Sequence, residues 1–70
     1  MSPLDQTTIT NKLAKLREII KILQHLSKIP KQQFLKDPII NGSAKYYLSL
    51  GIEIITDIGN HVLMEAFQIS

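Results

Sequence analysis

The sequence predicts an all-α protein in which two long antiparallel helices form a hairpin. Apolar residues recur every three or four positions through most of both halves of the chain, as on the buried faces of helices. One short proline-containing segment separates the two halves. At 70 residues the chain holds at most one domain, and its 44% hydrophobic content is that of a folded protein.

The first helix is predicted over residues 5–28. Asp5 stands at a favourable N-cap position, and Leu4 and Ile9 flank it as a hydrophobic staple. Pro30 disfavours helical geometry at Ile29 and ends the helix. The apolar residues form two stripes, which indicates neighbours on two sides. One stripe is Ile9, Leu13, Leu16, Ile20 and Leu23, and the other is Ile19, Ile22, Leu26 and Ile29.

A short helical connector is predicted over residues 30–36, with Phe34 and Leu35 holding it against the hairpin. The second long helix is predicted over residues 38–68. Asp37 followed by Pro38 is a strong start signal, because an acid caps the helix and proline suits its first position. No stop signal follows before the end of the sequence, so we expect the helical pattern to continue to about residue 68.

The small size of the chain predicts association. A domain of this length rarely stabilises itself through its core alone, and the sequence has no cysteine for disulfides or cysteine-rich zinc sites. We therefore expect two copies to pair into a four-helix bundle. Nine residues are predicted to form the dimer or core face: Leu13, Leu16, Ile20, Leu23, Leu48, Gly51, Ile55, Ile58 and Val62.

The charge is unevenly distributed along the chain. Residues 1–36 hold seven basic and two acidic side chains, and residues 37–70 hold one basic and four acidic side chains. Helices of opposite charge suit antiparallel packing, although the basic half could also bind nucleic acid. The apolar runs are too short for a membrane span or a signal peptide, so no membrane association is expected and a cytoplasmic protein is predicted.

A line of polar residues marks the second long helix. Glu53, Asp57, His61 and Glu65 follow at intervals of four, which predicts that they stack along one face of the helix. Such side chains could bind a metal, but the Glu and His three residues apart that di-metal bundles use are missing. The alternatives are a solvated line or one that faces a shared cleft. No nucleophile motif or phosphate-binding glycine loop is present, and no metal or cofactor is predicted.

Several segments of the sequence resemble HepT-like proteins of the HEPN superfamily. The matching residues are Phe34-Leu35-Lys36-Asp37-Pro38, Tyr47-Leu48, Ile52-Glu53-Ile54 and Asp57-Ile58-Gly59-Asn60-His61-Val62-Leu63. In that family an F-L-x-D connector leads into a long helix that carries E-x-x-x-D-x-x-x-H. With the lysine-bearing first helix, the resemblance covers nearly all 70 residues.

The resemblance implies a prokaryotic toxin that cleaves RNA without a metal, dimerises as a helical bundle and is encoded beside a nucleotidyltransferase antitoxin. The family's catalytic Arg and His are four to six residues apart on a later helix. Here Arg17 is the sole arginine, and seven residues separate it from His25. The catalytic pair would therefore lie beyond Ser70, which predicts a truncated and inactive domain in which Glu53, Asp57 and His61 would only line the cleft.

Three functions follow as hypotheses. The first is a truncated HepT-like toxin component that keeps the fold and the dimer of the family without its catalysis. The second is a helical dimerisation or interaction module without enzymatic activity, which could regulate a full-length toxin. The third is a basic RNA-binding scaffold that uses Lys12, Lys15 and Lys21.

Overall fold

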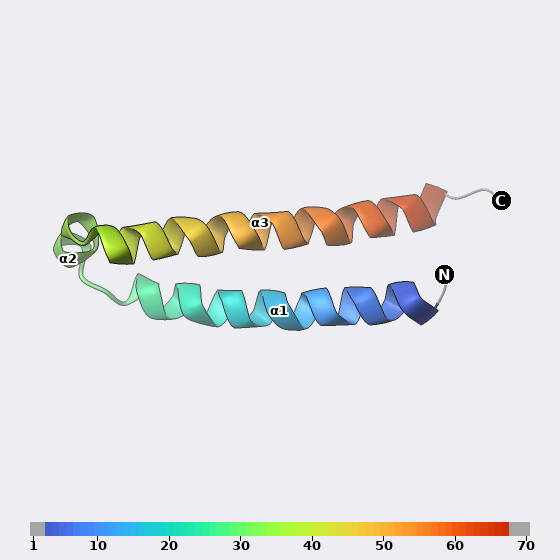
Figure 1. The fold of residues 1–70 in the computed structure, drawn as a ribbon, viewed down its shortest axis with the longest axis horizontal. Coiled ribbons are helices and arrows are strands. Elements are labelled where there is room, and N and C mark those ends of the chain that lie inside the picture. The colour runs from blue at the N-terminus through green and yellow to red at the C-terminus, as the bar shows by residue number, and fades with distance from the viewer. Residues whose placement is uncertain (1–2, 68–70) are drawn as a thin grey trace.

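The computed structural model describes residues 3–67, and it describes their side chains from residue 6 onward. It contains α1 (Pro3–Ser27), α2 (Lys31–Lys36) and α3 (Pro38–Phe67). The long helices α1 and α3 lie side by side and antiparallel, with α2 at the bend (Figure 1). The predicted all-α fold with two packed long helices is confirmed.

The helix bounds lie close to those that the sequence indicates. Helix α1 begins at Pro3 rather than at residue 5 and ends at Ser27. The predicted cap and staple use the side chains of Leu4 and Asp5, which lie outside the described residues, as does residue 68 of the second predicted helix. Helix α2 begins one residue after Pro30, and α3 begins at Pro38 as the Asp-Pro signal indicates.

Hydrogen bonds at the bend show why α1 stops and α2 follows. The Ser27 hydroxyl donates to the Gln24 carbonyl oxygen at 2.7 Å within the last turn of α1. Two residues after Ile29 the chain turns helical again, and the Phe34 amide donates to the Pro30 carbonyl oxygen at 2.9 Å. Proline suits this place because the first amides of a helix need no partner within the helix.

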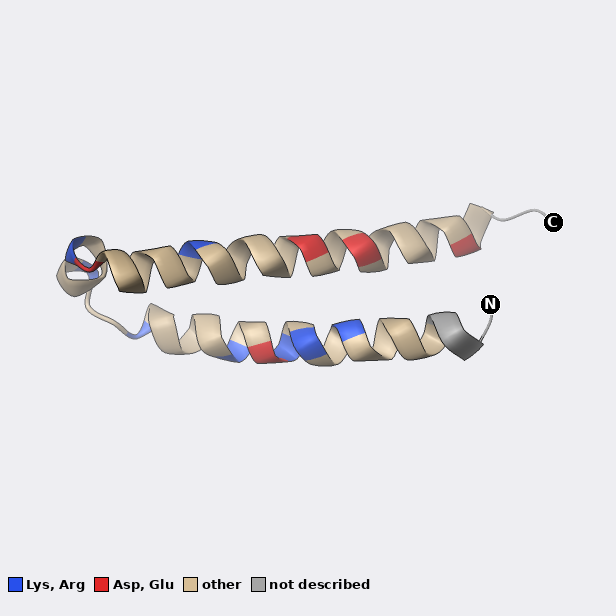
Figure 2. Ribbon diagram, in the orientation of Figure 1, with Lys and Arg blue, Asp and Glu red and all other residues tan. Residues whose placement is uncertain are grey.

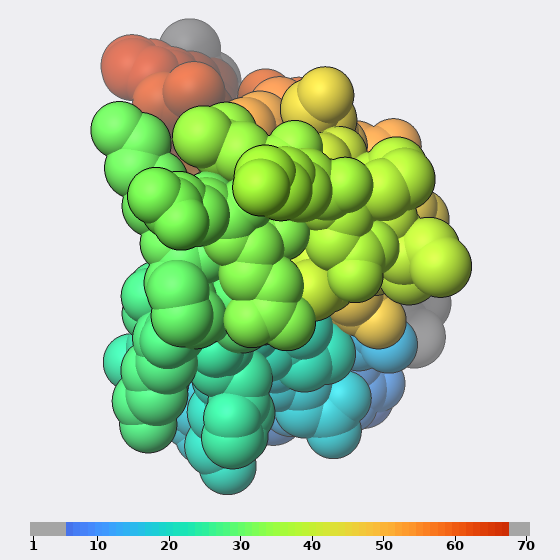
Figure 3. Space-filling model, turned by 90° about the vertical axis from the view of Figure 1, so that its left-hand side faces the viewer, coloured from blue at the N-terminus to red at the C-terminus, as the bar shows by residue number. Residues whose placement is uncertain are grey.

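Asp37 links α2 to α3. Its backbone amide donates to the Gln33 carbonyl oxygen at the end of α2. Its Oδ1 accepts hydrogen bonds from the amides of Ile39 at 2.9 Å and Ile40 at 3.3 Å, which is the arrangement of an N-cap. Seen from the bend, α2 and the first turns of α3 cover this end of the hairpin (Figure 3).

The contact between the long helices is made by one row of residues on each helix, spaced alternately by four and three. We call these the inner rows. On α1 the row is Thr8, Lys12, Lys15, Ile19, Ile22 and Leu26, and on α3 it is Ile40, Ala44, Tyr47, Gly51, Ile54, Ile58, His61 and Glu65. All are buried or half-buried except Lys15. Ile19, Ala44 and Ile54 are the buried hydrophobic residues of the core.

The hairpin is a single layer of two helices. Its extents are 54 × 17 × 14 Å, so it is about one and a half helix diameters thick in its short directions. Each long helix meets one long neighbour and has none across its other sides. As a result, many large apolar side chains of the described residues are exposed.

Candidate functional site

The polar line on α3 winds around the helix instead of following one face. A step of four residues overshoots a full turn by about 40°, so the line moves sideways as it advances. Glu53 and Asp57 are exposed, whereas His61 and Glu65 are half-buried in the inner row against α1. The two ends of the line therefore meet different surroundings, with Glu53 toward solvent and Glu65 toward the neighbouring helix.

Asp57 of this line bonds across the hairpin to α1. Lys12 Nζ on α1 donates to Asp57 Oδ2 at 3.2 Å, and the two side chains are 28% and 52% exposed. Along the same stretch of the hairpin, most charged positions on α1 are basic and most on α3 are acidic (Figure 2). The pair agrees with the opposite charges that the sequence assigns to the two halves.

The side chains of this line do not come together at one point where they could bind a ligand. Among the described residues, no three His, Asp or Glu side chains come close enough together to hold a metal ion. Asp57 points to Lys12, and no hydrogen bond in the described part of the chain joins it to His61. Asp57 forms an ion pair with Lys12, and His61 and Glu65 lie within the contact between the two helices.

A second pair of rows carries half of the twelve large apolar side chains that are exposed in the described part of the chain. These second rows stand one residue after the inner rows on each helix. On α1 the row is Ile9, Leu13, Leu16, Ile20, Leu23 and Ser27, and on α3 it is Asn41, Lys45, Leu48, Ile52, Ile55, Gly59, Val62 and Ala66. The exposed large residues among them range from Leu13 at 41% to Ile52 at 63%.

Both second rows lie on the same side of the hairpin. When two helices run antiparallel, the residues that directly follow the contact residues on each helix point toward the same face of the pair. The structure agrees, because Ile9 of α1 lines one hollow of about 290 Å³ together with Val62 and Ala66 of α3. Asn11, Lys15 and Ile54 line a different hollow. One face of the hairpin is thus apolar, and the Lys12–Asp57 pair lies toward the other face.

The nine residues predicted for the dimer or core face divide between the two kinds of row. Gly51 is buried and Leu16, Leu23 and Ile58 are half-buried in the hairpin. The other five are exposed: Leu13, Ile20, Leu48, Ile55 and Val62. Sequence reasoning did not select Ile19, Ala44 and Ile54 for this face, although the same 4–3 spacing contains them.

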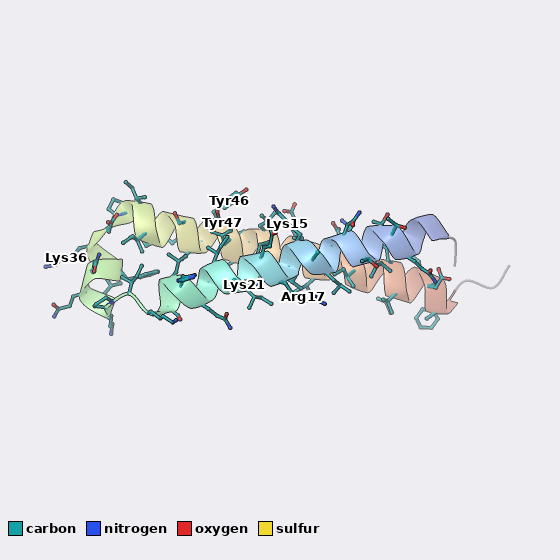
Figure 4. The ribbon with its side chains drawn as sticks, turned by 90° about the horizontal axis from the view of Figure 1, so that it is seen from below. Lys15, Arg17, Lys21, Lys36, Tyr46 and Tyr47 are labelled. Atoms are coloured by element: carbon teal, nitrogen blue, oxygen red, sulfur yellow. The ribbon has the colours of Figure 1, made fainter. Side chains whose placement is uncertain are left out.

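The three lysines of the RNA-binding hypothesis do not share a surface. Lys12 pairs with Asp57. Lys15 lies on the edge of the hairpin that also carries Tyr46, whereas Lys21 projects from another side of α1 (Figure 4). Arg17 lies one turn before Lys21 on α1. Sequence reasoning considered Arg17 only as a possible catalytic residue and did not include it among the RNA-binding side chains.

The bend carries a further open hollow of about 450 Å³. Apolar side chains line most of it, including Leu26, Phe34 and Ala44, with Lys31 at its margin. The Ser27 hydroxyl in its lining already donates to Gln24. The hollow therefore presents little polar chemistry that could orient a ligand.

No family model, curated protein or solved structure matches this chain. In the part of the chain that the structure describes, neither long helix combines the length and the apolar character that crossing a bilayer requires.

Proposed function

We propose that the chain is a helical interaction module that pairs with a second copy of itself through the second rows of α1 and α3. One observation carries the proposal: both helices present an uncovered apolar row with helix-packing spacing, on the same side of the hairpin. Rows with alternating spacings of three and four are the pattern by which helices interlock in bundles.

The surface area supports association. A globular monomer of 7.9 kDa exposes about 4,400 Å² by the scaling of surface with mass. This chain exposes 5,686 Å². The surplus of about 1,300 Å² exceeds the roughly 800 Å² per partner of a standard interface. A second copy that packs on the apolar face would bury an exposed area of this size.

A second hairpin suits the face better than a single helix does. Two parallel rows lie side by side, and each row accepts one helix. A second copy brings two helices with identical rows, and a two-fold axis makes such a surface complementary to itself. Lys45 is the one charged residue in the second rows, so pairing brings few like charges together. The product is a four-helix bundle.

Two lysine substitutions test this interface. We expect a dimer of twice the 7.9 kDa chain mass in sedimentation equilibrium at micromolar concentration. Ile55→Lys places a charge in the second row of α3 and should give a folded monomer. The matched control is Ile39→Lys, because Ile39 is 79% exposed and lies outside both rows. A monomeric parent chain, or equal effects of the two substitutions, would contradict the proposal.

A second candidate function follows from the resemblance to HepT-like proteins. We propose that the hairpin is the amino-terminal part of a truncated toxin of a prokaryotic toxin–antitoxin system, working in the cytoplasm with a nucleotidyltransferase antitoxin. Two features favour it: Asp37 of the F-L-x-D segment caps α3, and Glu53, Asp57 and His61 follow along that helix. The family acts on RNA through an Arg and His that these 70 residues do not supply.

Subunit exchange and RNA cleavage test this candidate separately. A full-length HepT-like toxin mixed with the chain should form mixed dimers, detected by native mass spectrometry, and Ile55→Lys should prevent them. The chain alone should leave labelled RNA intact. Cleavage by the chain that His61→Ala abolishes would contradict the predicted loss of catalysis. An absence of exchange by a chain that dimerises with itself would refute the toxin assignment and leave the interaction module standing.

A further inference from the structure

A third row of residues on α1 is exposed, basic and separate from both helix contacts. It stands one residue after the second row, again with spacings of four and three. Its members are Thr10, Ala14, Arg17, Lys21 and Gln24 on α1 and Lys28 in the turn directly after α1, and all six are exposed. Arg17 and Lys21 project from α1 away from the edge that carries Lys15 and Tyr46 (Figure 4).

The three cations of this row have no ionic partner among the described residues. The Lys12–Asp57 ion pair between α1 and α3 uses a lysine of the inner row. Glu18 is the sole acidic side chain described on α1, and it forms no ion pair with Arg17 or Lys21. The acidic residues of α3 lie across the hairpin (Figure 2). The positive charge of the row is therefore available to an external anion.

The shape of the row indicates a linear anion. Arg17 and Lys21 lie on α1 and Lys28 lies one residue past its end, so the three positions extend over about 16 Å at the rise of a helix. They form a line, so a single phosphate could not contact all three. Double-stranded nucleic acid presents about ten backbone charges over that length. The polar members of the row, Thr10 and Gln24, add hydrogen-bond donors of the kind that also contact phosphates and sugars.

The composition of the row also indicates how the contact works. The row contains no aromatic side chain to stack on bases and no large apolar side chain to enter a bilayer. We propose that the third row of α1 binds the phosphate backbone of nucleic acid without reading its sequence. This inference does not depend on the proposed dimer, because pairing through the second rows leaves the third row exposed.

Salt-dependent binding tests the proposal. The probes are a labelled 20-nucleotide single strand and a 20-base-pair duplex, followed by fluorescence anisotropy between 50 and 200 mM salt. Three phosphate contacts predict a slope of log K against log salt of about −2 for the single strand and about −3 for the duplex. The relative affinities of RNA and DNA forms of each probe then identify the preferred nucleic acid.

Two triple variants of equal charge locate the contact. Arg17→Gln/Lys21→Gln/Lys28→Gln should weaken binding at least tenfold and flatten the salt slope. The matched control, Lys31→Gln/Lys36→Gln/Lys45→Gln, removes the same charge outside the row and should bind within threefold of the parent. Circular dichroism checks that both variants stay helical. No binding at 50 mM salt, equal losses in both triples, or capture by phosphatidylserine vesicles in place of the nucleic acid probes would overturn the proposal.

Discussion

Ile19 of α1 packs directly over Gly51 of α3. A Cβ built on Gly51 would stand 3.6 Å from Ile19 Cγ2 and 3.9 Å from Leu16 Cδ1. Ile19 is 1% exposed, although it belongs to a two-helix layer in which most apolar side chains reach solvent. Ile19 packs against the backbone of α3 at Gly51 and still leaves room for a Cβ there, and the hairpin core is centred on this contact.

Truncation of Ile19 should destabilise the hairpin more than truncation of any exposed isoleucine. Ile19→Ala leaves a cavity beside Gly51, and we expect a loss of about 2–4 kcal/mol in the free energy of unfolding. The control Ile39→Ala should change it by less than about 0.5 kcal/mol. Urea unfolding followed by circular dichroism measures both. If Ile19→Ala is unfolded in buffer, Ile19→Val should show a loss of about 1 kcal/mol.

Alanine at Gly51 should stabilise the protein. The added Cβ meets Ile19 and Leu16 at ordinary van der Waals distances, and the unfolded chain loses conformational freedom. We expect a gain of about 0.5–1 kcal/mol. Gly42→Ala is the matched control, because a Cβ there meets nothing within 4 Å and reports helix propensity alone. A gain from Gly42→Ala with a loss from Gly51→Ala in thermal unfolding would show that α1 and α3 approach more closely than described.

Removal of the Asp37 carboxylate should destabilise the start of α3. Asp37→Ala leaves the amides of Ile39 and Ile40 without their acceptor, which costs about 1 kcal/mol. Asp37→Asn keeps an oxygen at the same place and should retain most of the stability. Amide hydrogen exchange at Ile39 and Ile40 should accelerate only in the alanine variant. Equal exchange rates in both variants would mean that the carboxylate does not hold the cap.

The Lys12–Asp57 pair should contribute little to stability. Its side chains are partly exposed, so water and salt screen the attraction. A double-mutant cycle with Lys12→Gln and Asp57→Asn should give a coupling energy of about 0.2–1 kcal/mol that decreases at 0.5 M salt. A larger, salt-independent coupling would indicate that a partner covers the pair, because burial removes the screening.

The sequence predicted the helices well, because their signals are local. Pro30 ends α1, and Asp37 with Pro38 begins α3, since these residues act on the backbone within one or two positions. The packing was harder to predict. Two apolar rows lie next to each other on each long helix, and spacing alone does not tell which of them meets the other helix.

The predicted interface shows this limit in particular residues. It combined Gly51 and Ile58, which lie in the inner row, with Ile55 and Val62, which lie in the second row. Ile54 and Ile55 are adjacent and chemically identical, yet one is buried and the other is 57% exposed. The rotation of α3 about its axis decides between them, and that rotation follows from how Ile19 fits over Gly51. The polar line was predicted to follow one face of α3, but it winds toward α1 because a step of four residues exceeds one helical turn.

The position of the bend sets the order in which the helices can join. Contacts near Phe34 close short loops, the Ile19–Gly51 contact closes a loop of about 30 residues, and the Lys12–Asp57 pair closes one of 45. Longer loops cost more entropy to close. We therefore expect the helices to join from the capped bend toward the open end, where they should join last and separate first.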